Sequence, residues 1–187
     1  MKPSSVLLVF LQLCCFQTML VSRPTCKLSG WVVQNTHNLL RDLGEPFPVQ
    51  CRQYNSKILF PDSALSDVSA NHRQCRWTSL VVYESLRGAE LMFTENELPE
   101  GEDELTWNKQ KLDNYLNLQN RLVEDHQCLN TTEASGVLAP YFSNVTAVVE
   151  QQDSASCGWE ALRRDVLWVL KFTLRKHHSC FNWTKAH

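Results

Sequence analysis

Apolar residues recur every three or four positions in five segments of the chain, which is the spacing of one face of an α-helix. The segments span about 26–43, 73–93, 104–125, 136–152 and 156–178. Gly44 is expected to cap the first helix, and Pro140 fits only a first turn, so the fourth helix should begin nearer Ala139. No segment alternates apolar and polar residues between glycine-rich turns, as strands do. The pattern predicts an all-α fold.

The connection between the first two predicted helices is much longer than a usual loop. It covers residues 44–72, contains three prolines and shows no helical period. A crossover of this length lets two consecutive helices run parallel in a bundle. The other three connections are short and predict antiparallel neighbours. With the first helix taken as up, the predicted order is up, up, down, up, down.

The N-terminus predicts a secretory signal peptide. Lys2 is the only charged residue before Arg23, and a short apolar run separates them. Cleavage after Ser22 would remove residues 1–22 and leave residues 23–187 as a single domain. The removed segment carries one lysine and no acid, so the net charge passes from −2 to −3.

Charge and motifs exclude several functions. A negative net charge gives no footprint for nucleic acid, and no apolar run reaches the ~18–20 residues that insertion across a membrane requires. The phosphate-loop, G-x-S-x-G and H-E-x-x-H motifs of enzymes are absent from the sequence. The adjacent His177 and His178 would point ~100° apart on a helix, which suits one metal ion poorly. The acidic run from Glu95 to Glu104 lacks the EF-hand spacing and predicts a solvated loop. We therefore predict no enzymatic activity, no cofactor and no metal site.

An even number of cysteines follows the predicted signal peptide, which indicates three disulfides in an oxidising compartment. These cysteines are Cys26, Cys51, Cys75, Cys128, Cys157 and Cys180. The predicted helix directions place Cys51 and Cys157 at one end of the bundle and the other four cysteines at the opposite end. A disulfide needs Cα atoms within about 7 Å, so Cys51 must pair with Cys157. The pairing of the other four cysteines stays open.

The segment around the fifth cysteine resembles the signature of the type I interferon family. The matching residues are Tyr141-Phe142-Ser143-Asn144-Val145, then Val148-Val149 and, after seven further residues, Cys157-Gly158-Trp159. The continuation to Asp165 is similar to the family's Cys-Ala-Trp-Glu-x-x-Arg-x-Glu. The departures are Val148 for an aromatic residue, Val149 for Leu and Gly158 for Ala or Thr. The spacing looks most like a teleost fish type I interferon, with six rather than four cysteines in the mature chain.

The resemblance implies a fold, a partner and a further disulfide. It implies an up-up-down-down helical cytokine bundle with five main helices and a long first crossover. It implies a secreted, extracellular protein that brings together the two chains of a heterodimeric class II cytokine receptor and so induces antiviral innate immune signalling. It also implies the bridge Cys26–Cys128, which leaves Cys75–Cys180 as the third. The alternatives are an interleukin-10-like cytokine, which lacks the signature, and a secreted helical carrier of an apolar ligand, which needs an internal cavity.

The resemblance further places the receptor-binding surface on the last helix and the first crossover. Steps of 100° per residue put Trp168 opposite the core stripe of the last helix, among basic residues. The candidate contacts are Arg163, Arg164, Trp168, Lys171 and Arg175 on the helix, with Arg52 and Asn55 in the crossover. We expect Arg163 and Trp168 to contribute to binding and to matter little for stability. Alternatively, the fourth helix or the crossover covers Trp168, and its loss would then reduce stability.

Three N-x-[ST] sequons become candidate glycosylation sites in a secreted protein. They begin at Asn130, Asn144 and Asn182. Asn130 lies in a predicted short connection and Asn182 in the C-terminal tail, so both should be accessible. Asn144 lies on a predicted helix, and we expect it to be modified less readily.

Overall fold

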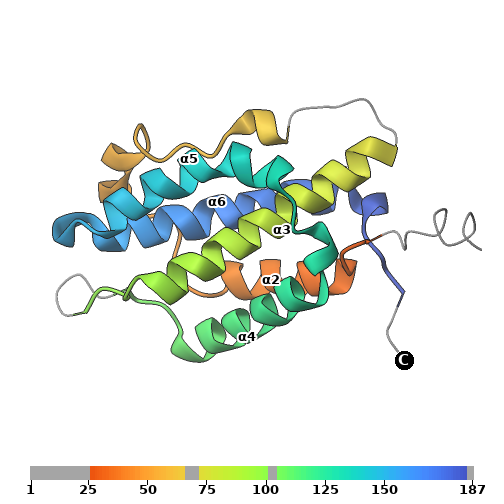
Figure 1. Ribbon diagram of the computed structural model, residues 1–187. Helices are drawn as coiled ribbons and strands as arrows, with labels where there is room; N and C mark the ends of the chain where they lie inside the picture. Colours follow the sequence, from red (N-terminus) through yellow and green to blue (C-terminus); the bar gives the residue numbers. More distant parts are fainter. Residues whose placement is uncertain (1–25, 66–71, 101–104, 185–187) are drawn as a thin grey trace, which may run out of the picture.

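Five long α-helices pack lengthwise in the computed structural model, which describes residues 26–65, 72–100 and 105–184 (Figure 1). They are α2 (Gly30–Arg41), α3 (His72–Glu95), α4 (Lys109–Asp125), α5 (Thr132–Val149) and α6 (Ala155–Lys176). The pairing Ser29↔Asn182 is an isolated bridge, and the described residues contain no strand. The all-α prediction is confirmed, whereas the predicted signal peptide lies outside the described residues.

The helix directions follow the predicted order. In Figure 1, α2 and α3 run the same way, α4 returns, α5 runs with α3, and α6 returns beside it. α3 packs against α4, α5 and α6, while α2 packs against α4 and α6. The apolar faces of all five helices meet in one core, in which Leu80, Leu86, Tyr115, Leu138 and Trp159 are fully buried.

Two helix ends differ from the predictions. α5 begins at Thr132, so Pro140 lies inside the helix rather than in its first turn. Pro140 leaves the carbonyl of Gly136 without its helical partner, and both residues are exposed, so water can satisfy that carbonyl. The cap of α2 is Asp42 instead of Gly44. Gly44 serves a close approach, because a Cβ there would lie 2.7 Å from the ring of Trp107.

The structure contains three disulfides, one at one end of the bundle and two at the other. Cys51–Cys157 joins the crossover to the start of α6 with its Cα atoms 5.1 Å apart. The Cα separations of Cys26–Cys128 and Cys75–Cys180 are 6.2 Å and 4.8 Å. The pair derived from helix directions, the pair implied by the resemblance and the remaining pair, Cys75–Cys180, are therefore all present. Each bridge closes a loop of more than a hundred residues and restricts the unfolded chain accordingly.

The crossover runs from the end of α2 back along α5 and α6 (Figure 1). It contains two short 3₁₀ helices, η1 (Val49–Tyr54) and η2 (Asp62–Ala64), where the sequence showed no periodicity. Between them, Ile58 and Phe60 are buried while Leu59 is exposed. Near its end, the indole N–H of Trp77 on α3 donates to the carbonyl of Ala64 at 2.8 Å. The described crossover is therefore a packed layer rather than a loose loop.

Candidate functional site

The crossover contacts α6 at three successive positions along the helix. The disulfide Cys51–Cys157 holds it at the start of the helix. Further along, Asn55 of the crossover accepts a hydrogen bond from Arg164. The rings of Phe60 and Trp168 then meet with their centroids 5.8 Å apart. The crossover and α6 therefore form one joint surface, which we call the crossover–α6 face.

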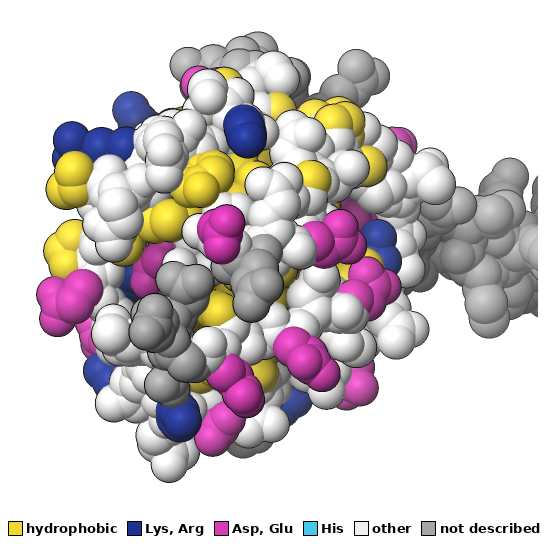
Figure 2. Space-filling view, turned by 90° about the vertical axis from the view of Figure 1, so that its left-hand side faces the viewer, with side chains coloured by type: hydrophobic (Ala, Val, Ile, Leu, Met, Phe, Trp, Pro, Cys, Tyr) yellow, Lys and Arg dark blue, Asp and Glu magenta, His cyan; other side chains and the backbone are white. Residues whose placement is uncertain are grey.

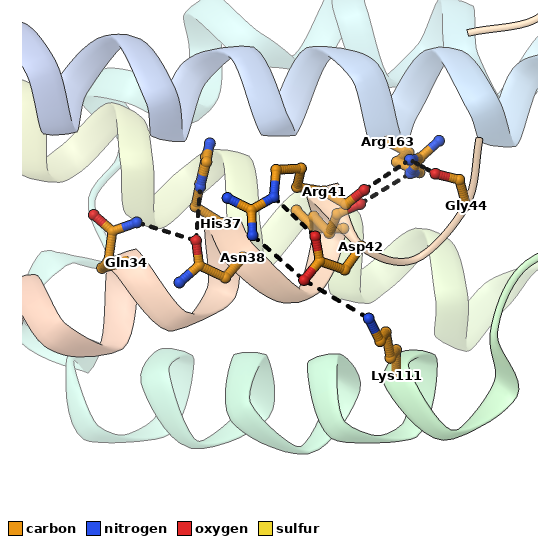
Figure 3. A network of polar contacts seen from close by, with 9 residues as sticks. Gln34, His37, Asn38, Arg41, Asp42, Gly44, Lys111 and Arg163 are labelled. Atoms are coloured by element: carbon orange, nitrogen blue, oxygen red, sulfur yellow. Dashed lines mark hydrogen bonds and ion pairs between the residues drawn. The ribbon is translucent and has the colours of Figure 1, made fainter. Parts of the chain in front are cut away.

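Arg163 lies beneath this face and joins α6 to the end of α2. Its guanidinium donates to the carbonyl oxygens of Gly44 at 2.6 Å, Glu45 at 2.7 Å and Leu40 at 3.0 Å (Figure 3). It also reaches the carbonyl of Arg41 at 3.3 Å. Carbonyls at the end of a helix have no partner within the helix, and the planar fork of arginine can bind several of them at once.

A buried ion pair completes the arrangement around Arg163. Its side chain is 6% exposed and lies 3.0 Å from Oε2 of Glu160. The other carboxylate oxygen of Glu160 accepts the indole N–H of Trp107 at 2.6 Å. The expectation that Arg163 matters little for stability is therefore wrong, because its charge is paired with Glu160 and its N–H groups are bonded to backbone carbonyls inside the protein. Its contribution to the face is to position the crossover.

Arg164, the next residue, lies on the outer side and connects three elements. Its guanidinium donates to both carboxylate oxygens of Asp165, at 2.7 Å and 3.0 Å. It stacks over the ring of Phe47 at 4.5 Å and donates to Asn55. The predicted contacts Arg164 and Asn55 are thus neighbours across the crossover–α6 face.

Asp165 anchors this cluster from within. It is buried, and Tyr141 on α5 donates its hydroxyl to it at 3.1 Å. Burial raises the pKa of Asp165 above its usual range, although the hydrogen bonds and charge of Arg164 act in the opposite direction. Burial and the neighbouring Asp165 carboxylate raise the pKa of Tyr141 as well. The carboxylate ties α6 to α5 directly below Arg164.

Trp168 is partly covered by the crossover, which lies between the two outcomes expected from the sequence. The indole packs on Phe60 and on Phe172, at centroid distances of 5.8 Å and 5.6 Å, yet the residue is 38% exposed. Phe60 in turn contacts Tyr141 at 5.2 Å. An aromatic residue held by rings on two sides is a rigid contact for a partner and needs little further ordering.

The remaining predicted contacts are exposed. Lys171 and Arg175 follow Trp168 on α6, and Arg52 lies in η1. Sequence analysis missed Leu59, which is 68% exposed at the crossover. The sequence carries no signal for it, because Ile58, Leu59 and Phe60 are all apolar and only the structure shows that the middle one faces solvent.

A second concave surface lies between α3 and α5. It is a groove of about 260 Å³, and its lining includes Glu84, Arg87, Leu91 and Phe142. Glu84 is 3% exposed, and its Oε2 pairs with Arg87 at 3.2 Å. Its Oε1 has no hydrogen-bond partner within the described residues. Burial raises the pKa of Glu84, and the unpartnered oxygen is itself buried below the surface of the groove.

Asn130, Asn144 and Asn182 are all exposed. Asn144 lies on α5, as expected, but it is exposed like the other two, so burial does not set it apart. In the last sequon, Asn182 accepts hydrogen bonds from the backbone N–H and the hydroxyl of Thr184, at 3.0 Å and 2.8 Å. Glycosylation of the three sites stays a prediction.

Other features bear on the alternative functions. In the described core, an enclosed space between α2, α3, α4 and α6 measures about 10 Å³, which is too small for an apolar ligand. Among residues 26–65, 72–100 and 105–184, no three His, Cys, Asp or Glu residues gather as metal ligands. Within the same ranges, none of the helices has the length and apolar character needed to cross a bilayer.

Comparison with known proteins identifies a family and a similar solved structure. Residues 29–178 match the family described as "Interferon alpha/beta domain". The fold is similar to the solved structure of zebrafish interferon 2, with a TM-score of 0.62 and 26% sequence identity over 77% of this chain and 96% of that chain. A search of curated protein sequences gave no match. The interleukin-10-like alternative receives no support from these matches.

Proposed function

Because this chain belongs to the interferon alpha/beta family, we propose that it is a secreted cytokine that bridges the two chains of a heterodimeric class II cytokine receptor and so induces antiviral signalling. The family consists of cytokines without enzymatic activity. The function would therefore lie in two binding surfaces and in the geometry that holds them on one rigid bundle.

The observation that carries the proposal is the fixed position of the crossover on α6. The disulfide Cys51–Cys157, the Asn55–Arg164 hydrogen bond and the Phe60–Trp168 contact order the crossover before any partner arrives. Binding then costs less conformational entropy than it would with a mobile loop. A surface assembled in advance from two distant segments is suited to tight binding of one receptor chain.

The side chains of this face indicate the chemistry of its partner. Trp168 and Leu59 offer exposed apolar area, while Arg52, Lys171 and Arg175 supply positive charge. Tryptophan and arginine dominate the energetics of many interfaces. The matching receptor surface would combine acidic side chains with an apolar patch that accepts the indole.

The groove between α3 and α5 is suited to the other receptor chain. It combines the half-buried ring of Phe142 and the exposed Leu91 with the unpartnered oxygen of Glu84. A receptor side chain that covers Phe142 and Leu91 would displace water from the groove. The groove and the crossover–α6 face lie on different helix pairs, so two receptor chains can bind together.

The test is to treat fish cells with purified disulfide-bonded protein and to measure antiviral transcripts. We expect induction in cells with both receptor chains and none after either chain is deleted. The variant Leu91→Arg, at the α3–α5 groove, should bind one chain normally but fail to induce transcripts. Induction in cells that lack either receptor chain would contradict the proposed bridging.

A further inference from the structure

The C-terminal half of α6 carries an open depression beyond the point where Phe60 meets the helix. Its volume is about 580 Å³, and its lining consists of Trp168, Lys171, Phe172, Arg175 and Lys176. The two aromatic rings lie side by side with a centroid distance of 5.6 Å. All three basic residues are exposed. The depression therefore combines an aromatic floor with three positive charges.

These charges have no acidic partner in the described part of the chain. Lys171, Arg175 and Lys176 form no ion pair there, and no carboxylate lines the depression. On the facing helix, the pKa of His37 is lowered mainly by burial, and the charge of Lys171 lowers it further, although Asn38 and Asp42 act in the opposite direction. The local field thus disfavours another cation and favours an anion.

A helix end alone does not account for this arrangement. Basic residues in the last turn interact favourably with the helix dipole, and Arg175 and Lys176 occupy that turn of α6. Lys171 lies a full turn earlier, outside the reach of that effect. The dipole also gives no reason for two partly exposed aromatic rings among the cations.

The opposite end of the bundle carries acidic side chains with basic ones among them. Acidic side chains gather over the end where α3 and α5 finish, as Figure 2 shows. The described acids there include Glu95, Glu97, Glu150 and Asp153, all exposed. The depression on α6 differs from this mixed surface, because its lining holds three cations and no carboxylate, and it can attract a polyanion although the net charge is negative.

We propose that the depression on α6 binds a sulfated polysaccharide of the cell surface or the extracellular matrix. The sulfate groups would pair with Lys171, Arg175 and Lys176, while the C–H faces of the sugar rings would pack on Trp168 and Phe172. A neutral glycan would leave the cations unused, and an inorganic anion would leave the rings uncovered. This goes beyond receptor binding, because the ligand is a carbohydrate and requires only that the protein is secreted.

The proposed ligand shares residues with the proposed receptor surface. Trp168, Lys171 and Arg175 belong to both, so one molecule cannot bind the polysaccharide and that receptor chain at the same time. Sulfated chains would hold the protein near the cells that release it, in a form that does not signal. Release from the chain would restore access to the receptor.

The test measures binding of purified protein, with its three disulfides intact, to immobilised heparin as the sulfated probe. We expect binding at physiological salt that weakens as the salt concentration rises. The triple variant Lys171→Gln, Arg175→Gln, Lys176→Gln should bind about tenfold more weakly or worse, because three ionic contacts are lost. Phe172→Ala should weaken binding a few-fold while leaving the charge unchanged, about the effect expected for a lost stacking contact.

The matched control changes three exposed basic residues elsewhere, Lys27→Gln, Arg76→Gln and Arg121→Gln, and alters the net charge equally. We expect its affinity for heparin to stay within about twofold of the unchanged protein. Equal weakening by the control and the triple variant would show general charge attraction and overturn the proposal. Hyaluronan carries carboxylates without sulfates, and the proposal would also be overturned if hyaluronan competed as well as soluble heparin does. Binding to phosphatidylserine vesicles as tight as binding to heparin would overturn it as well. Circular dichroism checks that each variant is folded.

The two proposals fail separately. Heparin binding is measured without any receptor, so a protein that binds heparin but induces no transcripts contradicts the cytokine function alone. A protein that induces transcripts but does not bind heparin contradicts the polysaccharide site alone. If both hold, added heparin should reduce induction by the unchanged protein, and hyaluronan at the same concentration should not.

Discussion

The two halves of α6 use the same residue types for opposite purposes. In the N-terminal half, Arg163 and Arg164 turn towards α2 and the crossover and are bonded to both. In the C-terminal half, Lys171 and Arg175 face solvent and form no ion pair with the described residues. The difference lies in the neighbouring chain, since carbonyl groups near the end of α2 enclose Arg163 and the crossover bonds to Arg164, whereas the crossover reaches the second half only at Trp168.

This comparison separates residues that hold the surface from residues that present it. An arginine enclosed by carbonyl oxygens stabilises the fold and cannot contact a partner directly. An arginine or lysine at the surface adds little stability and is free for recognition. Substitutions in the first half of α6 should therefore change stability, and substitutions in the second half should change binding.

The largest effect is expected from Arg163→Ala. Removal of the guanidinium leaves Glu160 as a buried charge without its ion-pair partner and takes a donor from the carbonyls that follow α2, so we expect about 3–5 kcal/mol less free energy of unfolding. Arg163→Lys should also destabilise the protein, because an ammonium group cannot reproduce the planar fork. Urea denaturation measures both variants. The control Arg175→Ala should stay within about 0.5 kcal/mol, and unchanged stability of Arg163→Ala would refute the division of roles.

The disulfide that pins the crossover gives the next effect. Cys51→Ser with Cys157→Ser should cost about 2–5 kcal/mol of stability and also weaken receptor binding, because the crossover is released. Cys75→Ser with Cys180→Ser is a matched control, since its sequence separation is 105 against 106. The control should lose similar stability but keep its receptor affinity. Equal loss of affinity in both pairs would show that pinning is not what prepares the surface.

The sequence predicts the helices and the end-to-end placement of the cysteines because both depend on local periodicity and loop length. It could not distinguish Arg163 from Arg164. The two side chains leave the helix about 100° apart, and which of them is enclosed depends on carbonyls more than a hundred residues earlier in the chain. The requirement for glycine at position 44 could not be predicted either, because it comes from the close approach of the Trp107 ring.

The departures from the family signature are also explained only by the fold. A Cβ at Gly158 would lie 2.6 Å from the side chain of Val149 and 3.0 Å from its backbone nitrogen. The glycine and the valine are two of the three departures, and they fit each other across the α5–α6 turn. In the sequence the two differences look unrelated, whereas in the structure Gly158 and Val149 pack directly against each other.

Trp168→Ala tests the second half of the comparison. We expect receptor binding to weaken by about 1–3 kcal/mol, the range of an interface hot spot. Its contact with Phe60 means that stability should also fall, by about 1–2 kcal/mol, less than for a fully buried tryptophan. Trp31→Ala is the matched control, because Trp31 is 46% exposed and packs on Trp183 at 5.4 Å. Calorimetry and receptor titration on both variants check this, and an unchanged affinity of Trp168→Ala would remove the indole from the site.

The smallest expected effect is a pH dependence confined to the first half of α6. Burial raises the pKa of Asp165 in the folded protein, so the folded state binds more protons than the unfolded state between the usual and the raised pKa. Its contribution to stability is complete below the usual pKa of an aspartate and is lost as the pH rises through the raised value. Asp165→Asn should therefore remove part of the stability that the protein gains on acidification from neutral pH.

Arg164→Gln should enlarge that gain, since removal of the positive charge raises the pKa of Asp165 further. Denaturation from pH 4 to 7 measures the free energy of unfolding of each variant relative to the unchanged protein. His37, whose pKa is lowered, contributes in the opposite direction. Every variant retains His37, so its contribution cancels in these differences. Arg175→Gln should leave the profile unchanged, because its side chain does not act on Asp165, and an altered profile in that variant would mean that the two halves of α6 are electrostatically coupled.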